Sequence, residues 1–168
     1  MAFYEDFSFY EFFERYKKTK HINIGWLEDG YCFETADLPS DFLDKLWDFC
    51  NVLVIQTRGL HYCDFCAEKS KIVIHRNGVE HVLGDSEIRV FGERQVFASP
   101  NMIYHYVQKH HYQPPAAFVK AVYDCPNPSS NEYFELLEKE GLPWMLMNGR
   151  KSNIEKMKHP LQQKEDLK

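Results

Sequence analysis

Apolar side chains recur along much of this chain at the spacing of an amphipathic helix. In residues 40–50, Phe42, Leu46 and Cys50 share one helical face, and Pro39 stands at a suitable helix start. The same kind of pattern predicts further helices over 7–18, from 99 or 100 to about 109, over 115–124 and over 129–140. The aromatic side chains of 7–18 are expected to belong to the core or to a packing surface.

Short apolar and β-branched runs between these helices predict strands. Residues 71–75 and 79–83 flank Asn77-Gly78, a dipeptide typical of a tight hairpin turn. A wholly apolar run at 52–55 is typical of a buried strand. Further strands are predicted at 22–27, 87–91 and 95–98. These elements indicate an α+β fold, in which a small antiparallel sheet of hairpins packs with about five helices.

The length of 168 residues suits one domain with a hydrophobic core of its own. We expect this domain to span 1–147, because no stretch inside that range has the composition of a linker. From 148 to 168 the residues are mostly polar and rich in lysine, so this segment is expected to form a flexible tail.

Composition and charge limit the classes of protein that remain. Apolar residues make up 44% of the chain and aromatic residues 15%, which excludes disorder over most of its length. The formal net charge of −5 argues against a nucleic-acid partner, since phosphate backbones are bound by clustered Lys and Arg. The sequence contains neither a long apolar membrane span nor a secretory signal pattern, so we expect a cytoplasmic protein.

The clearest chemistry lies in the pair Cys63 and Cys66, which have C-x2-C spacing. Two thiolates at this spacing can turn around one metal ion, and reduced thiols agree with a cytoplasmic location. A redox-active pair of this type should begin a helix that follows a strand, whereas residues 67–70 lead into a predicted strand. The pattern therefore predicts a metal-binding knuckle at 61–66.

Histidines can complete this site with imidazole ligands. His105 and His110 have the H-x4-H spacing found in structural zinc sites, and two sulfur donors with two nitrogen donors favour Zn²⁺. In an ideal helix these two residues lie about 140° apart, so both can bind one ion only if the helix ends nearby. His61 and His111 therefore remain open as alternatives for the fourth ligand. His75 and His81 on the predicted hairpin are also possible, but His81 is expected to pack beside Val79 and Leu83 instead.

Three segments resemble a family of small bacterial proteins of unknown function. Residues 58–66 follow the knuckle pattern R-G-x-H-x-C-x-x-C, and residues 84–90 follow the strand pattern G-x-x-E-I-R-V. The third segment contains I-Y-H-Y-V and, after a short gap, Y-Q-P-P. The resemblance covers roughly 50–125 and implies a cytoplasmic α+β bacterial protein, without implying an activity. The adjacent pair His110-His111 departs from the family's simpler H-x-Y spacing.

Two functions agree with this chemistry. The leading hypothesis is a zinc-stabilised module that binds another protein, as an immunity or regulatory protein does. The alternative is a zinc-dependent hydrolase with Cys63, Cys66 and His105 as ligands, a water in the open position and Glu87 as general base. The sequence has no H-E-x-x-H, deaminase, G-x-S-x-G or phosphate-loop motif, so enzyme activity stays undecided.

A recognition pocket beside the site is a further possibility that the residues suggest. Arg58 and Arg89 could line it together with Tyr104 and Tyr106, because aromatic residues and arginine favour recognition surfaces. One of these two tyrosines is expected in the core and the other at the surface.

Overall fold

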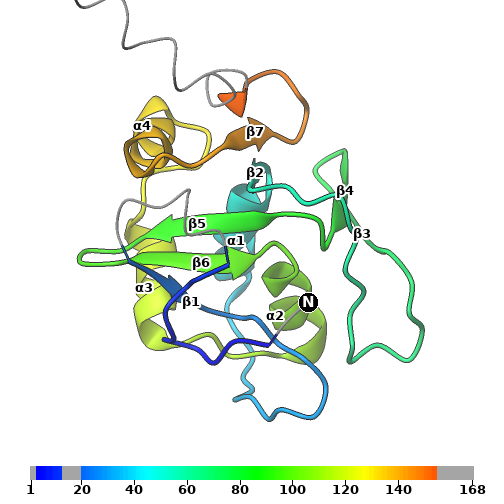
Figure 1. Cartoon of the computed structure of the whole chain (residues 1–168). Coiled ribbons are helices and arrows are strands. Elements are labelled where there is room, and N and C mark those ends of the chain that lie inside the picture. The colour runs from blue at the N-terminus through cyan, green and yellow to red at the C-terminus, as the bar shows by residue number, and fades with distance from the viewer. Residues whose placement is uncertain (1–2, 13–19, 155–168) are drawn as a thin grey trace, which may run out of the picture.

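The computed structural model of the chain describes residues 3–12 and 20–154. These residues confirm the expected α+β fold, with four helices where about five were expected and with two sheets (Figure 1). The helices are α1 (Ser40–Cys50), α2 (Ile103–His110), α3 (Ala116–Asp124) and α4 (Asn131–Glu140). The strands are β1 (His21–Asn23), β2 (Val52–Val54), β3 (Ile72–Arg76), β4 (Val79–Leu83), β5 (Glu87–Phe91), β6 (Val96–Pro100) and β7 (Trp144–Leu146).

The larger sheet has five strands in the order β1-β6-β5-β2-β7. Its pairs are antiparallel except for β1, which runs parallel to β6, so the expected antiparallel sheet is in fact mixed. Strands β3 and β4 form a separate two-stranded sheet. The turn between them confirms the hairpin prediction, since Asn77 and Gly78 have φ of 52° and 73°, as a type I′ turn requires.

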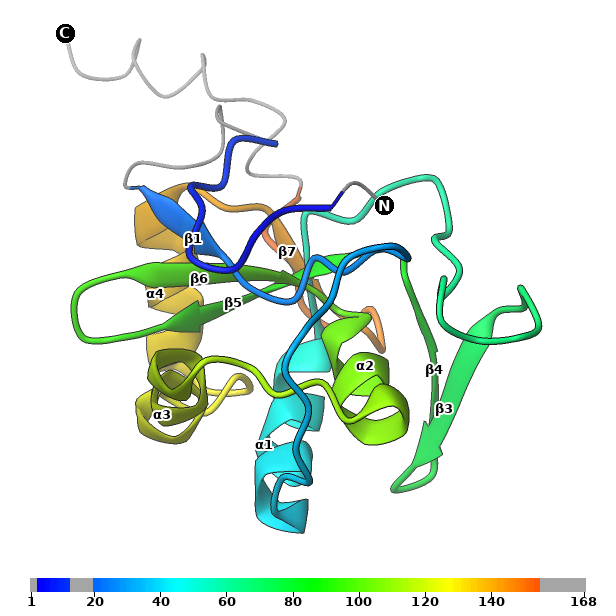
Figure 2. The same cartoon turned by 90° about the horizontal axis from the view of Figure 1, so that it is seen from below.

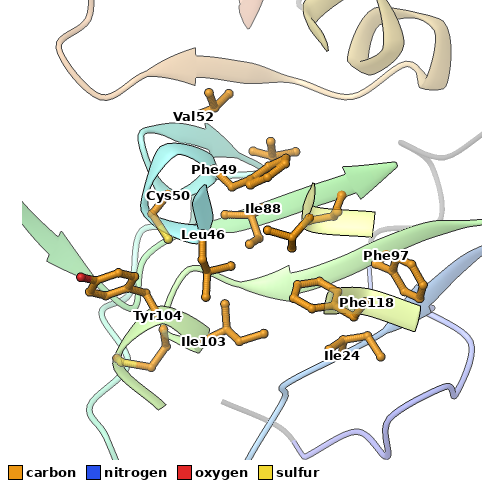
Figure 3. Packing of buried hydrophobic residues seen from close by; sticks show 14 of the residues in the cluster. Ile24, Leu46, Phe49, Cys50, Val52, Ile88, Phe97, Ile103, Tyr104 and Phe118 are labelled. Carbon is orange, nitrogen blue, oxygen red and sulfur yellow. The ribbon is translucent and has the colours of Figure 1, made fainter. Parts of the chain in front are cut away.

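Three helices cover one face of the five-stranded sheet, where α1, α2 and α3 lie together (Figure 2). Ile88 of β5 points toward this layer and meets Leu46 of α1 and Ile103 of α2 (Figure 3). All three side chains are fully buried. Burial of an aliphatic side chain of this size stabilises a fold by about 1.5–3 kcal/mol, so this interface is the main core.

The N-terminal segment, residues 3–12, covers the opposite face of the sheet. Single β-bridges join Tyr4 to Trp26 and Phe9 to Ile22. A second, smaller cluster of buried side chains results, made of Tyr10, Trp26 and Ala98 with Tyr4 packed against it. The sheet is therefore buried on both faces.

This arrangement corrects the helix predicted over 7–18. Residues 7–12 are not helical, and residues 13–19 lie outside the described part of the chain. The side chain of Asn23 donates to the hydroxyl of Ser8 and to the carbonyl of Phe9, both at 3.0 Å, and so holds this backbone along β1. These contacts come from a distant strand and override the local helical pattern.

The aromatic residues of this segment divide between the interior and the surface of the protein. Tyr10 is buried, whereas Phe7 is 52% exposed and Phe12 is 53% exposed. The segment thus buries one aromatic ring and presents others to solvent.

Strand β7, for which the sequence offers no clear pattern, pairs with β2 through Trp144–Leu146. Asn153 fixes it, because its side chain accepts from the Trp144 N–H at 2.8 Å and donates to the Leu142 carbonyl at 2.9 Å. Asn153 is buried, so contacts of the folded chain continue past residue 147.

A tight corner at Gly84 brings together the loop after β2, the end of β4 and the start of α2. The Gly84 N–H donates to the side chain of Asn101 at 2.7 Å, and its carbonyl accepts from the His61 N–H at 2.8 Å. Gly84 has φ of +104°, and a Cβ there would lie 2.3 Å from the His61 carbonyl oxygen. Only glycine fits, because any side chain would push the loop away from the helix.

We predict that Gly84→Ala lowers the free energy of unfolding by roughly 3 kcal/mol, since a positive φ and a backbone clash act together. Gly30→Ala is the matched control, because Gly30 has φ of +93° and no atom within 4 Å of an added Cβ. The control should lose only about 1 kcal/mol. Denaturant unfolding measures both values, and equal losses in the two variants would contradict the role of Gly84.

A second prediction concerns His81, which is buried in β4 with its ring 5.7 Å from that of Trp47. Burial lowers the pKa of His81, and the charge of Asp85 opposes this only in part. The unfolded chain therefore binds a proton more readily than the folded one. Stability should be complete above about pH 6.5 and fall below it, by at most about 1.4 kcal/mol per pH unit from this group.

Replacing the ring should make the loss of stability on acidification shallower. We expect His81→Leu to lose less free energy of unfolding between pH 7 and pH 5 than the wild type. His75→Leu, at the exposed histidine of the same hairpin, should keep the wild-type slope. Parallel slopes for His81→Leu and wild type, measured by urea unfolding at each pH, would refute the assignment.

Candidate metal centre

The two cysteines lie in the loop between β2 and β3, which has no regular secondary structure near them. Cys63 is buried and Cys66 is half-buried. The backbone N–H groups of Phe65 and Cys66 donate to the sulfur of Cys63, as expected for a knuckle that turns around its first thiol. The ammonium group of Lys69 donates to the carbonyls of Cys63 and Asp64, at 3.1 and 2.7 Å, and closes the loop.

The two histidines lie on α2, one in its first turn and one at its end. His105 is in the buried part of the helix, and His110 is its last residue. His111 follows with φ of 56°, in the left-handed conformation, so the helix stops there. The early end that the H-x4-H spacing requires is therefore present, and the Nε2 atoms of His105 and His110 lie 3.2 Å apart.

All four side chains converge at one point. The Cys63 sulfur lies 3.3 Å from Nε2 of His110, and the Cys66 sulfur lies 3.3 Å from Nε2 of His105 and 3.4 Å from Nε2 of His110. All four ligand atoms lie within 4.8 Å of one another. A tetrahedral zinc ion, bound at about 2.3 Å to sulfur and about 2.0 Å to nitrogen, places its ligand atoms about 3.3–3.8 Å apart. The four residues thus fit a metal ion, and they could hold one.

The electrostatics of the group also suit a cation. Burial, and after it the neighbouring His110 ring, lowers the pKa of His105 to about 4, so this imidazole is neutral at neutral pH. Burial also lowers the pKa of His110, with Lys109 as the next cause. Burial raises the pKa of the Cys63 thiol to about 11. A metal ion would displace the thiol proton, because the thiolate is the binding form.

The other candidate histidines lie elsewhere. His111 places its Nδ1 2.7 Å from a carboxylate oxygen of the exposed Asp37. The Nε2 atom of His61 lies 4.0 Å from a carboxylate oxygen of Asp64. His81, expected to pack inside the protein, lies against Trp47. Between the two adjacent histidines, the structure brings His110 and not His111 to the cysteines.

Aromatic rings surround the cysteine loop and hold it against the helix. Phe65, between the two cysteines, packs edge-on against Phe33 and Tyr106, with ring centroids 5.2 and 5.7 Å apart. Its ring also lies 5.5 Å from that of His110. The sequence pattern of the knuckle gave no reason to single out Phe65, because its packing partners come from distant segments.

Glu87 is not placed as the open, solvent-accessible base that hydrolysis would need. Its side chain is buried, and one carboxylate oxygen lies 2.6 Å from the guanidinium group of Arg89. The other oxygen accepts from the Tyr10 hydroxyl at 2.8 Å. Both carboxylate oxygens of Glu87 are therefore engaged inside the protein, by Arg89 and by Tyr10.

The recognition pocket suggested by Arg58, Arg89, Tyr104 and Tyr106 does not form. Both tyrosines are buried, which corrects the expectation that one would be exposed. Arg58 is exposed, whereas Arg89 is fully buried with Glu87. The ring of Trp47 in α1 packs against Tyr104, and the ring of Phe65 in the cysteine loop packs against Tyr106. A helical pattern alone does not reveal these partners.

Sequence reasoning also missed Asn101, which positions α2 and the loop. Its amide group donates to the Ser86 hydroxyl at 2.8 Å and its side-chain oxygen accepts from the Gly84 N–H at 2.7 Å. Asn101 is completely buried, so each of these bonds is made away from water. In the sequence, Asn101 falls in the first turn of the helix predicted from 99 or 100, and that position gives no signal of this role.

Comparison with known proteins adds the family of the chain. A search of the curated proteins and a search of the solved structures each found no match. Among the described residues no helix combines the length and apolar character that crossing a bilayer needs. A family model described as a domain of unknown function, DUF7919, matches residues 2–123, a range that includes all four residues of the candidate metal centre. Since this match covers most of the length of the chain, the chain belongs to the DUF7919 family of domains of unknown function.

Proposed function

We propose that Cys63, Cys66, His105 and His110 hold one structural zinc ion in a protein whose role is to bind a partner. The observation that carries this proposal is the convergence of four ligand atoms within 4.8 Å. Two sulfur and two nitrogen donors match the preference of Zn²⁺ for a closed tetrahedral site.

A structural role follows from what the ion would connect. The loop between β2 and β3 has little regular structure of its own, whereas α2 is packed in the core. Four bonds to one ion would fasten this loop to the end of the helix. Structural zinc contributes directly to folding free energy, because the unfolded chain holds no preformed site.

A zinc hydrolase is the less favoured reading. Four protein donors complete a tetrahedron, so no ligand position is left for a reactive water. The general base proposed from the sequence, Glu87, has its carboxylate engaged by Arg89 and Tyr10. Both points favour a closed site with a role in folding.

Binding of another protein, as in an immunity or regulatory module, agrees with the surface of the chain. The net charge is −5, and several large aromatic rings are more than 40% exposed, namely Phe7, Phe9, Phe12, Tyr31 and Tyr62. Aromatic residues at a surface are typical anchors of protein interfaces. We further propose that the protein works in a reducing compartment such as the bacterial cytosol, since all five cysteines are free thiols.

The first test is metal content. The purified wild type should contain about one zinc ion per chain, and Cys63→Ser should lose it and at least about 3 kcal/mol of unfolding free energy. Elemental analysis and denaturant unfolding measure the two effects. Cys32→Ser, at an exposed cysteine, is the control and should keep both values.

The adjacent histidines offer a sharper version of the same test. His110→Gln should lose the ion, whereas His111→Gln should keep it, because only His110 faces the cysteines. Cobalt substitution should give the strong visible absorption of a tetrahedral ion with two thiolates. Full zinc content in His110→Gln, or a cobalt spectrum with an exchangeable water ligand, would reject the closed site.

A further inference from the structure

A cavity of about 320 Å³ is lined in part by the loop that leads into the cysteine knuckle. The N-terminal segment forms one wall, through Tyr4 and Phe12, and the residues after β1 contribute Trp26. Leu60 and His61, just before the knuckle, form another wall. The floor is the chain from the end of β4 to the first residue of β5, and it includes Asp85 and Glu87. Figure 2 shows these segments near the labelled N-terminus.

The aromatic wall is held rigidly in place. The indole N–H of Trp26 donates to the Ala98 carbonyl at 2.9 Å, which fixes the orientation of the ring. The Tyr4 ring meets it edge-on, with centroids 5.6 Å apart, and the Tyr4 N–H donates to the Trp26 carbonyl. A ligand with an apolar body would therefore meet a preformed surface, at little cost in ordering the protein.

The floor of the cavity carries more negative than positive charge. The carboxylate of Glu87 is neutralised by Arg89, at 2.6 Å. The carboxylate of Asp85 has only neutral partners in the described structure, the side-chain amides of Gln56 at 2.9 Å and Asn101 at 3.4 Å. No Lys or Arg is among the described residues that line the cavity. One carboxylate thus faces this space without a cationic partner.

The cavity therefore combines aromatic and aliphatic walls with one carboxylate, that of Asp85, whose side-chain partners among the described residues are amides. Aromatic faces and a carboxylate together favour an organic cation over a neutral or anionic ligand.

A second cavity, of about 430 Å³, lies on the other side of the N-terminal segment and serves as a comparison. Its acidic residues Glu5 and Glu34 are exposed to solvent. Its third, Asp6, already accepts from the Tyr112 hydroxyl at 2.6 Å and from the Gly25 N–H at 2.8 Å. Water screens the charges of the first two carboxylates. The bonds that Asp6 accepts are shorter than those of Asp85, at 2.9 and 3.4 Å, so Asp85 is the less satisfied carboxylate and the smaller cavity is the better cation site.

We propose that the cavity between Trp26, Leu60 and Asp85 binds a small organic cation, a protonated amine carried on an apolar group about the size of one ring. The ammonium group lies at Asp85, and the apolar group lies between the aromatic wall and Leu60. This site is separate from the metal centre and does not depend on the identity of the metal.

The test uses the full chain and 2-phenylethylamine, compared with 2-phenylethanol and 3-phenylpropanoate by isothermal titration calorimetry. The amine should bind about tenfold more tightly than the alcohol, and the acid should not bind measurably. A fourth ligand, Nα-acetyl-lysine amide, distinguishes the source of the amine. Tighter binding of the lysine derivative would assign the site to a side chain of a partner protein, and tighter binding of 2-phenylethylamine to a free small molecule.

Variants locate the binding. Asp85→Asn should remove the preference for the amine, lowering its affinity about tenfold. Leu60→Trp should fill the cavity and abolish binding of both amine and alcohol, and it covers the case in which Asp85→Asn does not fold. Glu34→Gln, in the larger cavity, should change nothing.

Equal affinities for amine and alcohol, no binding of any of the four ligands, or loss of amine binding in Glu34→Gln would each overturn the proposal. Zinc content is measured on the same samples. Failure of the amine site with one zinc ion retained is thus distinguished from failure of the metal centre.

Discussion

The contact between the irregular loop after β2 and the C-terminal end of α2 is the constraint on which the rest of this structure depends. Two thiols and two imidazoles meet there within 4.8 Å, and Phe65 fills the space beside them. Without an ion, these thiols and imidazoles hydrogen-bond to one another at 3.2–3.4 Å. One cation would bind all four donor atoms at once, which is why the donor set favours a metal centre.

The corner at Gly84 and Asn101 makes this contact possible on the protein side. The buried Asn101 side chain ties the start of α2 to the corner, and the corner in turn binds the backbone of His61. The loop therefore reaches the cysteines from a fixed starting point. Because fixed ends reduce the entropy that binding must overcome, an ion would find its ligands largely preorganised.

The same loop also forms a wall of the cavity proposed to bind an amine. Leu60 and His61 line that cavity, and Cys63 follows two residues later. The N-terminal segment closes the other side and covers the buried pair of Glu87 and Arg89. The N-terminal segment and the proposed amine cavity thus lie on the face of the sheet opposite to helices α1, α2 and α3.

The sequence by itself determined the local elements and the types of ligand. The helical pattern of 40–50 and the Asn77-Gly78 turn appear in the structure as predicted, because each depends on neighbours a few residues away. Cys63 and Cys66 could be recognised for the same reason, since their spacing alone suits one ion.

Only the tertiary structure decided what depends on distant partners. It decided that His110 and not His111 lies beside the cysteines. Adjacent residues on a helix point about 100° apart, and the chain leaves the helix between these two. It placed residues 7–12 along β1 through Asn23, against their helical pattern. It also buried Glu87 beside Arg89, since the N-terminal segment covers a face of the sheet that a strand pattern cannot distinguish from an exposed one.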